Sequence, residues 1–274
     1  MQRLPVRADL AQVFLYVPAH DERKIAKALA GTGADVVILD LEDGVPPSER
    51  ETARRHVAAM SAQSQTSILV RMNAVGAQDH AADLAAIHAA RIVAGVVLAK
   101  ADAAGIRALA PRLPDGLGLW PLIESAAGVA SLPSLTSGLP LAGLLLGAGD
   151  LLADLGARWT REELPLLYAR SQLVMTAAAC GIPAIDTPDA EFRDLELLAE
   201  RSARARDLGF SGKAAIHPAQ IDVIRAAFTP SADEIRWARE VIAKAADGGA
   251  WTSGSEVQDA ATVRRAERIL EGVE

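Results

Sequence analysis

The chain has 274 residues and a mass of 28.7 kDa, which suits one α/β barrel of about 250 residues with a short extension. Half of its residues are apolar but only 4% are aromatic, so a core must be built mainly from Ala, Leu, Val and Ile. The formal charge is −7 and no run of Lys or Arg interrupts the sequence, which argues against a partner that is a nucleic acid.

Cysteine content and hydropathy indicate the cellular environment in which we expect the protein. Cys180 is the only cysteine, which excludes an internal disulfide and predicts a buried, inert thiol. The first apolar run, Val13 to Val17, is too short for the core of a signal peptide, so we expect a cytoplasmic protein. The uncharged stretch from Ser125 to Gly149 is broken by Pro133 and Pro140, so we expect no membrane association.

Eight short apolar runs predict buried parallel strands, because their apolar residues are continuous rather than alternating. In chain order they are Val13–Val17, Asp35–Leu41, Ile68–Met72, Gly95–Ala99, Leu117–Ile123, Ala142–Leu146, Pro183–Ile185 and Lys213–Ile216.

Segments with a helical period lie between these runs, including Asp21–Ala30, Pro47–Met60, Asp79–Ala90, Arg161–Cys180 and Glu191–Leu208. Gly181 and Gly209 stand where the last two should end. The number, order and size of the units predict a (β/α)8 barrel, a TIM barrel, over residues 1–230, with an open doubly wound sheet as the alternative.

Residues 231–274 predict a C-terminal extension: a helix over Ser231–Lys244, a flexible Gly- and Ser-rich linker over Asp247–Ser255 and a terminal helix to about Leu270.

Ionisable and polar residues follow the predicted strands and are rare before them. In chain order they are Asp40, Glu42, Asp43, Arg71, Asn73, Lys100, Glu124, Asp150, Asp186 and His217. Because the carboxyl ends of barrel strands share one face, we expect these side chains to meet at a single mouth.

Carboxylates crowded at one mouth repel each other, so the pattern predicts a bound cation. Glu124 and Asp150 follow neighbouring strands and are our candidate ligands for Mg²⁺, which prefers oxygen donors and keeps positions open for a substrate. A helix-capping role is the alternative for Asp150. Zinc is disfavoured because the histidines show no ligand spacing, and we expect His56, His80 and His88 on helix surfaces.

Two cations complete the predicted site. The planar guanidinium of Arg71 is suited to binding a substrate carboxylate with two hydrogen bonds, and a structural ion pair with Glu42 or Asp43 is the alternative. Lys100 is expected to balance the carboxylates and assist substrate binding, although it could instead form a Schiff base in a metal-free aldolase. His217 is equally compatible with a structural and a catalytic role.

Five segments together resemble the citrate lyase beta-chain-like branch of the HpcH/HpaI aldolase family. They are Leu39–Asp43, Val70–Asn73, Leu122–Ser125, Gly147–Leu151 and Gly212–Pro218, and the resemblance extends from about Val13 to Thr229. It implies a Mg²⁺-dependent barrel, a homotrimer, and a reaction that breaks or forms a carbon–carbon bond between a 2-oxo acid and an acyl thioester.

The resemblance also implies residue roles. Glu124 and Asp150 match the family's metal ligands, and Arg71 matches the arginine that binds the substrate carboxylate and polarises its carbonyl. Asp40, Glu42 and Asp43 match an acidic group around the metal. Val257–Ala260 resembles the family's lid motif, which makes Asp259 a candidate acid/base. Ala19, Gln12 and Gly149 depart from the pattern, where Gly, Arg and Glu are usual.

The function expected from this resemblance is cleavage or condensation of a 3-hydroxy-acyl thioester such as citryl-, citramalyl- or malyl-CoA. The products of cleavage would be acetyl-CoA and a 2-oxo acid, and the carrier could be coenzyme A or an acyl-carrier protein. Thioester hydrolysis, a free 2-oxo-acid aldolase and a non-catalytic subunit are the alternatives.

Overall fold

The computed structural model describes residues 11–61, 66–136, 139, 141–245, 251–253 and 256–271. The chain forms two compact units, residues 1–225 and residues 226–274. No helix in the described part of the chain has both the length and the apolar character needed to cross a bilayer.

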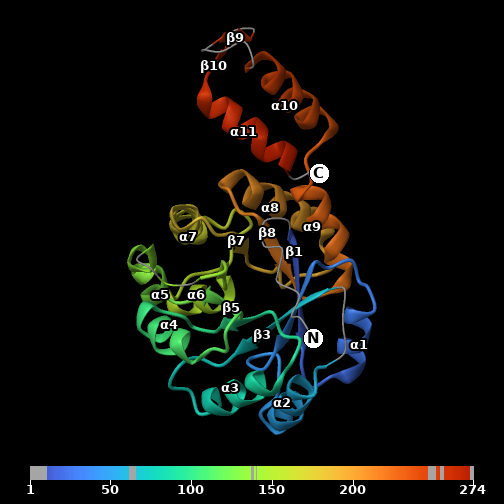
Figure 1. Cartoon of the computed structure of the whole chain (residues 1–274), viewed down its shortest axis with the longest axis vertical. Helices are drawn as coiled ribbons and strands as arrows, with labels where there is room; N and C mark the ends of the chain where they lie inside the picture. The colour runs from blue at the N-terminus through green and yellow to red at the C-terminus, as the bar shows by residue number, and fades with distance from the viewer. Residues whose placement is uncertain are drawn as a thin grey trace. The chain divides into compact units, whose positions relative to one another are not determined.

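The first unit is a closed barrel of eight parallel strands in sequence order, with helices around the outside (Figure 1). The strands are β1 (Val13–Pro18), β2 (Val36–Asp40), β3 (Ser67–Met72), β4 (Gly95–Leu98), β5 (Gly118–Ile123), β6 (Leu144–Leu146), β7 (Ala184–Asp186) and β8 (Gly212–Ala215). Pairing of β1 with both β2 and β8 closes the sheet. The predicted TIM barrel is therefore confirmed, and the open sheet is wrong.

Aliphatic side chains and one aromatic pair fill the barrel interior. Phe14 on β1 meets Trp120 on β5 with ring centroids 5.6 Å apart and planes tilted by 57°. The other buried members of this core cluster are Ala, Val, Leu and Ile. Gly143 lies against the Trp120 ring, where a Cβ atom would come within 2.1 Å of it, so the large indole depends on a missing side chain. This core agrees with the aromatic-poor composition.

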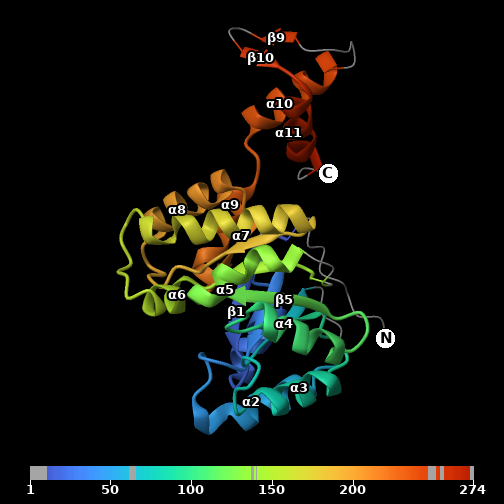
Figure 2. The same cartoon turned by 90° about the vertical axis from the view of Figure 1, so that its left-hand side faces the viewer.

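In the described part of the chain, nine α-helices alternate with these strands and lie outside them, and Figure 2 labels α2 to α9. They are α1 (Glu22–Leu29), α2 (Arg50–Ala58), α3 (His80–Ala89), α4 (Ala103–Leu109), α5 (Ala126–Ser131), α6 (Ala148–Asp154), α7 (Leu167–Cys180), α8 (Leu195–Leu208) and α9 (Ile221–Phe228), with short 3₁₀ turns η1 (Pro47–Glu49), η2 (Ala110–Arg112), η3 (Leu132–Thr136), η4 (Leu164–Leu166) and η5 (Pro218–Gln220). Gly181 and Gly209 end α7 and α8 in the left-handed conformation, with φ of 66° and 100°, as predicted.

Two helices begin later than predicted. The helix predicted from Arg161 begins at Leu167, because Glu163 has a left-handed φ of 55° and is followed by η4, which contains Pro165. The helix predicted from Glu191 begins at Leu195, where the Asp194 side chain caps it by accepting a hydrogen bond from the Leu197 amide at 3.0 Å.

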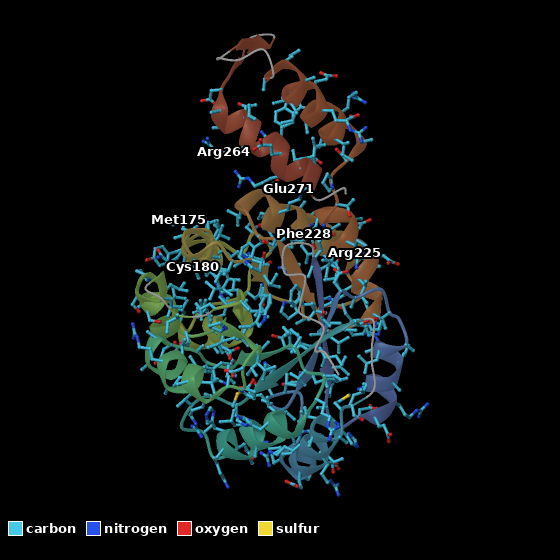
Figure 3. All side chains as sticks on the ribbon, viewed as in Figure 1. Met175, Cys180, Arg225, Phe228, Arg264 and Glu271 are labelled. Atoms are coloured by element: carbon cyan, nitrogen blue, oxygen red, sulfur yellow. The ribbon has the colours of Figure 1, made fainter. Side chains whose placement is uncertain are left out.

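Two further expectations concern single side chains. His80 is not on a helix surface as predicted; it is buried, and its Nδ1 lies 3.0 Å from the Asn73 carbonyl oxygen. Cys180 is the last residue of α7 and is only partly buried, with Sγ 3.9 Å from the Leu135 carbonyl oxygen (Figure 3). The thiol therefore lies at the edge of the core rather than inside it.

The second unit is a helical hairpin with a two-stranded sheet. Helices α10 (Ala232–Ala245) and α11 (Ala260–Glu271) pack around Ala238, Val241 and Ala266. Strands β9 (Trp251–Ser253) and β10 (Glu256–Gln258) pair antiparallel, so part of the predicted flexible linker is a strand. Trp, Thr and Val favour extended structure, which outweighs the Gly and Ser content there. The remaining linker residues, 247–250 and 254–255, lie outside the described residues.

Candidate metal and substrate site

A cavity of about 360 Å³ opens at the carboxyl ends of the barrel strands. Side chains at the ends of β2 and β3 and after β5 and β6 line it, among them Asp40, Arg71, Glu124 and Asp150. The structure therefore brings together four residues that the sequence placed at one mouth.

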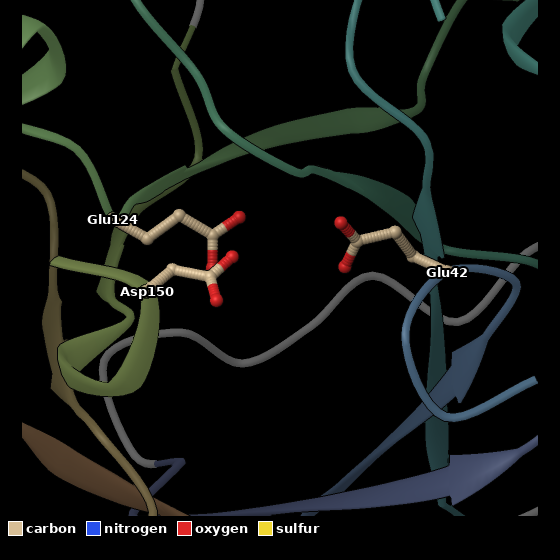
Figure 4. Close-up of side chains that lie close together, drawn as sticks. All are labelled: Glu42, Glu124 and Asp150. Carbon is tan, nitrogen blue, oxygen red and sulfur yellow. The ribbon is translucent and has the colours of Figure 1, made fainter. Parts of the chain in front are cut away.

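Three carboxylates converge at this mouth (Figure 4). Glu42, Glu124 and Asp150 each present an oxygen, and these oxygens lie within 4.8 Å of one another. Glu42 and Glu124 are buried, whereas Asp150 is partly exposed. The predicted ligand pair is thus close in space, and Glu42 joins it as a third possible donor.

Burial of Glu124 carries an electrostatic cost. Its Oε1 accepts a hydrogen bond from the Lys100 amide at 2.7 Å, and the absence of a side chain at Gly147 leaves room for Oε2. Burial, followed by the charge of Glu42, raises the pKa of Glu124 to about 8. A divalent cation bound to these oxygens would offset that cost, and the oxygen-only donor set fits Mg²⁺.

Lys100 lies against the same carboxylates. Its Nζ is 2.7 Å from Glu42 Oε1 and 3.0 Å from Asp150 Oδ2, and 3.8 Å from Asp43 Oδ2 at the exposed side. Partial burial lowers the Lys100 pKa, but the hydrogen bonds that Lys100 donates to Glu42 and Asp150 outweigh burial and raise the pKa overall. A Schiff base requires the free amine, so this setting favours charge balance over the Schiff-base alternative. The predicted role of Lys100 in substrate binding stays a prediction.

Arg71 is fixed by two carboxylates of the β2 end. Its Nε and Nη2 donate to Asp40 Oδ1 and Oδ2 at 2.7 and 2.6 Å, and its Nη1 lies 3.0 Å from Glu42 Oε2. Burial lowers the pKa of Arg71, but the hydrogen bonds to Asp40 and its charge raise the pKa by a larger amount. The pKa is therefore raised overall, and the side chain stays charged. Because Arg71 also lines the cavity, the structural ion pair and a substrate-binding role are compatible.

Asp40 is itself immobilised by the chain that follows it. The amides of Glu42 and Gly44 donate to its Oδ1 and Oδ2, both at 2.9 Å. A Cβ atom at position 44 would come within 2.4 Å of Oδ2, so only glycine permits this loop. Asp40 therefore orients Arg71, and Asp43 stays largely exposed at the rim.

Three polar strand ends do not reach the cavity as predicted. Asp186 is fully buried against Arg170 and Lys213, and Asn73 donates to the Leu41 carbonyl oxygen and to Asp83. His217 caps η5 by accepting the Ala219 amide at 3.1 Å, and its ring stacks on Phe192. These contacts support the structural interpretation of His217.

Asp259 belongs to the second unit and precedes α11. Its Oδ1 accepts hydrogen bonds from the amides of Ala261 and Thr262 at 2.8 and 3.2 Å, and these bonds lower its pKa. The residue is thus the N-cap of α11. Its predicted acid/base role stays a prediction.

Sequence reasoning missed two aromatic residues of the cavity. Tyr16 on β1 lies beneath the Arg71 guanidinium, with Cζ 5.1 Å from the ring centroid, and burial raises the pKa of its hydroxyl. Tyr16 lies two residues before Pro18, near the carboxyl end of the first strand, and this position could have identified it as a cavity residue. Trp159 lies in a loop that no strand pattern marks.

A family model described as HpcH/HpaI aldolase/citrate lyase matches residues 12–218. The chain is 32% identical to citramalyl-CoA lyase, mitochondrial, of Rattus norvegicus, over 93% of this chain and 84% of that protein. It is 34% identical to a citrate lyase subunit beta-like protein of Mycobacterium tuberculosis, over 94% of this chain and 93% of that protein. The (3S)-malyl-CoA thioesterase of Cereibacter sphaeroides is also 34% identical, over 84% of this chain and 81% of that protein.

Solved structures agree with these similarities. CitE from Mycobacterium tuberculosis in complex with magnesium, acetoacetate and coenzyme A superposes with a TM-score of 0.86 and 33% identity, covering 97% of this chain and 100% of that one. RipC from Yersinia pestis gives a TM-score of 0.73 and 36% identity, covering 84% and 100%.

Proposed function

Because the chain belongs to the HpcH/HpaI aldolase/citrate lyase family, we propose that it is a Mg²⁺-dependent lyase of 3-hydroxy-acyl-CoA thioesters. Cleavage would release acetyl-CoA and a 2-oxo acid, and condensation is the same reaction in reverse. Relatives named citramalyl-CoA lyase and a structure with bound magnesium and coenzyme A support this proposal.

The juxtaposition of an acidic cluster with a fixed arginine in one cavity is the observation that carries the proposal. Glu42, Glu124 and Asp150 would hold the metal ion, which acts as a Lewis acid on substrate oxygens when bound. Arg71 lines the same cavity and is oriented by Asp40. This set can bind a 2-oxo acid through its carboxylate and carbonyl oxygens.

In the cleavage direction, the hydroxyl proton of the substrate leaves as the carbon–carbon bond breaks. The hydroxyl oxygen becomes the carbonyl oxygen of the 2-oxo acid, and the bonding electron pair passes to the thioester as an enolate. Arg71 would stabilise the negative charge on the substrate oxygens with a guanidinium that Asp40 already holds in place. Protonation of the enolate carbon then gives acetyl-CoA.

The proton transfers require an acid/base group, and we propose Asp259 for this role on the strength of the family resemblance. The acidic residues Asp40, Glu42 and Asp43 are the other candidates. Asp40 is engaged with Arg71 and two backbone amides, and Glu42 is paired with Arg71 and Lys100. Asp43, which is largely exposed, is therefore the least engaged of the three.

Thioester hydrolysis is the second candidate, because a (3S)-malyl-CoA thioesterase is among the relatives. The two reactions are separated by incubating the protein with Mg²⁺ and malyl-, citramalyl- or citryl-CoA and measuring 2-oxo acid and free thiol together. A lyase gives 2-oxo acid and acetyl-CoA without free thiol. Hydrolysis gives free thiol without 2-oxo acid, and neither product from any thioester contradicts both candidates.

A cytoplasmic location, a homotrimer and a barrel domain ending near residue 230 complete the proposal. Light scattering on the purified protein tests the trimer. Coenzyme A is the carrier that we favour, since the CitE structure contains it; activity restricted to thioesters of an acyl-carrier protein would contradict that choice.

A further inference from the structure

Tyr16 forms part of the cavity floor. It follows Phe14 on β1 at a spacing of two residues, so both side chains point to the same side of the strand, toward the barrel interior. Phe14 belongs to the core cluster of the barrel, and the Tyr16 ring packs against this cluster while also lining the cavity. The Arg71 guanidinium, with Cζ 5.1 Å from the ring centroid, adds a second contact that fixes the ring.

The packing of the ring does not account for its hydroxyl. Within the described part of the chain, no group forms a hydrogen bond with Tyr16 Oη. The atom is not sealed off from solvent, so it faces the open space of the cavity. A phenylalanine would pack in the same way, so the hydroxyl must find its hydrogen-bond partner in whatever fills the cavity.

Arg71 can make only part of the contacts that a bound carboxylate needs. Its Nε and one N–H of Nη2 are used by Asp40, and Nη1 is turned toward Glu42, which leaves one N–H on each terminal nitrogen. The oxygens of a carboxylate accept more hydrogen bonds than these. Because a carboxylate removed from water is costly without such bonds, a further donor would stabilise it.

The other lining side chains that carry an N–H or O–H are engaged. The indole Nε1 of Trp159 donates to Glu163 Oε1 at 3.0 Å, and Thr187 is buried with Oγ1 3.0 Å from the Ala148 amide. Apart from Arg71, the charged residues of the lining are carboxylates, which repel an anion. Among the described residues that line the cavity, the Tyr16 hydroxyl is therefore the neutral side-chain donor that stays open to a ligand.

The surroundings of Tyr16 keep this donor protonated. Burial raises the pKa of the hydroxyl, Arg71 lowers it by a smaller amount, and the charges of Glu124, Asp40 and Glu42 raise it again. Among these charged groups Arg71 and Glu124 have the largest effects. The hydroxyl is thus neutral at pH 7 and within the electrostatic reach of both the proposed carboxylate-binding group and a candidate metal ligand.

We propose that the Tyr16 hydroxyl donates a hydrogen bond to the carboxylate of the 2-oxo acid portion of the substrate, beside the N–H groups of Arg71. The inference rests on the proposed function and adds a substrate-binding residue to it. Arg71 supplies the charge that attracts the carboxylate. Tyr16 supplies a neutral donor and adds no second cation to a site that must also hold Mg²⁺.

The proposed contact has a defined kinetic signature. The carboxylate keeps its charge from the bound substrate to the transition state, so the contact stabilises both states alike. Tyr16→Phe keeps the ring and its contact with Arg71 and removes only the hydroxyl. It should raise KM at least about tenfold and leave kcat within about twofold. A loss in kcat at unchanged KM would place the hydroxyl on a reacting oxygen and overturn this assignment.

Binding of 2-oxo acids to the Mg²⁺-loaded full chain tests the contact without turnover. Isothermal titration calorimetry with glyoxylate, pyruvate and oxaloacetate identifies the acid that binds most tightly, and Tyr16→Phe should bind that acid at least about tenfold more weakly. Mg²⁺ affinity should stay the same, because the substitution changes no charge. Tyr168→Phe is the matched control, since Tyr168 is the only other tyrosine, is 70% exposed and lies outside the cavity.

Fluorine NMR reports on the hydroxyl-bearing ring itself. Protein made with 3-fluorotyrosine carries one label at Tyr16 and one at Tyr168, and the Tyr168→Phe variant identifies the Tyr16 resonance. Adding the 2-oxo acid to the Mg²⁺-loaded protein should shift the Tyr16 resonance and leave that of Tyr168 in place.

The remaining outcomes are also decisive. An affinity that Tyr16→Phe leaves unchanged, an equal loss in Tyr168→Phe, or a Tyr16 resonance that the acid does not shift overturns the inference alone, because the unaltered protein still binds the acid. If none of the three acids binds the unaltered Mg²⁺-loaded protein, the proposed function fails and the inference fails with it.

Discussion

Arg71 combines two functions that only a guanidinium can combine. It uses Nε and Nη2 on Asp40, keeps Nη1 near Glu42, and still faces the cavity. We predict that Arg71→Lys lowers kcat/KM, because an ammonium cannot reproduce the forked contact. The decrease should correspond to a loss of about 2–4 kcal/mol of transition-state stabilisation. Steady-state kinetics on the active thioester measures the loss.

A surface arginine provides the control for this substitution. Arg161 also pairs with a carboxylate, since its Nη2 lies 2.8 Å from both side-chain oxygens of Glu200, but it is exposed and lies outside the cavity. Arg161→Lys should leave kcat/KM unchanged. If Arg71→Lys behaves in the same way, Arg71 has a structural role alone.

The raised pKa of Glu124 makes Mg²⁺ binding depend on pH. Below a pKa of about 8 the metal-free carboxyl is largely protonated, and Mg²⁺ requires the carboxylate, so binding at pH 7 should release a proton. Affinity should rise as the pH approaches about 8 and level off above it. Calorimetry at pH 7 in two buffers of different ionisation enthalpy measures the proton released; equal heats in both would contradict the prediction.

Substitution of the candidate ligands tests the site itself. Glu124→Gln and Asp150→Asn should each abolish Mg²⁺ binding and turnover without unfolding the barrel, because they remove charge and keep size. Glu51→Gln on the exposed surface of α2 is the control. Full turnover in excess EDTA would show that the reaction needs no metal ion.

The sequence predicted Glu124 and Asp150 as a pair because Glu124 directly follows one strand, Asp150 comes four residues after the end of the next, and strand ends converge in a barrel. It placed Glu42 only in the wider acidic group around the metal ion and not beside these two ligands. Glu42 comes two residues after β2, and its direction depends on the bond from its own amide to Asp40. Such a turn is decided by tertiary contacts rather than by periodicity.

Strands β7 and β8 are joined by a buried ionic cluster that includes α7. Lys213 on β8 donates to Asp186 on β7 at 2.9 Å, and Arg170 on α7 contacts the same carboxylate; all three are buried. We predict that Lys213→Met destabilises the protein by about 3–5 kcal/mol, because it leaves charges buried without their partner. Glu200→Gln, which breaks the exposed pair with Arg161, should change the free energy of unfolding by at most about 0.5 kcal/mol in urea titrations.

The same cluster should be sensitive to acid. Burial would raise the Asp186 pKa, but Lys213 and Arg170 lower it below the ordinary 3.8. The stabilising contribution of Asp186 is therefore present above that ordinary pKa and lost as the pH falls through the lower folded-state pKa. Unfolding free energies measured between pH 5 and 2 should fall less steeply in Asp186→Asn than in the unaltered protein; parallel curves would exclude this contribution.

Strands were more predictable than helix starts for a physical reason. A strand buried on both faces needs an uninterrupted apolar run, and such a run is visible in the sequence itself. The start of α7 instead depends on Glu163, whose left-handed backbone is held by a buried contact with Arg170. The position of the Lys213 ammonium was equally hard to predict, because a lysine in a strand is ordinarily exposed. It is buried here because carboxylates far away in the sequence, such as Asp186, accept its hydrogen bonds.

The role of the second unit in turnover rests on Asp259, which has two separable properties. As the N-cap of α11 it stabilises that helix, and Asn can replace it in this capacity with little loss. As an acid/base group it needs a carboxyl, which Asn lacks. We predict that Asp259→Asn lowers turnover at least about tenfold while leaving thermal stability and Mg²⁺ affinity unchanged. Asp259→Ala should show the same kinetic loss together with a destabilisation of about 1 kcal/mol from the lost cap. Full turnover in Asp259→Asn would restrict the residue to capping and make Asp43 the next candidate for proton transfer.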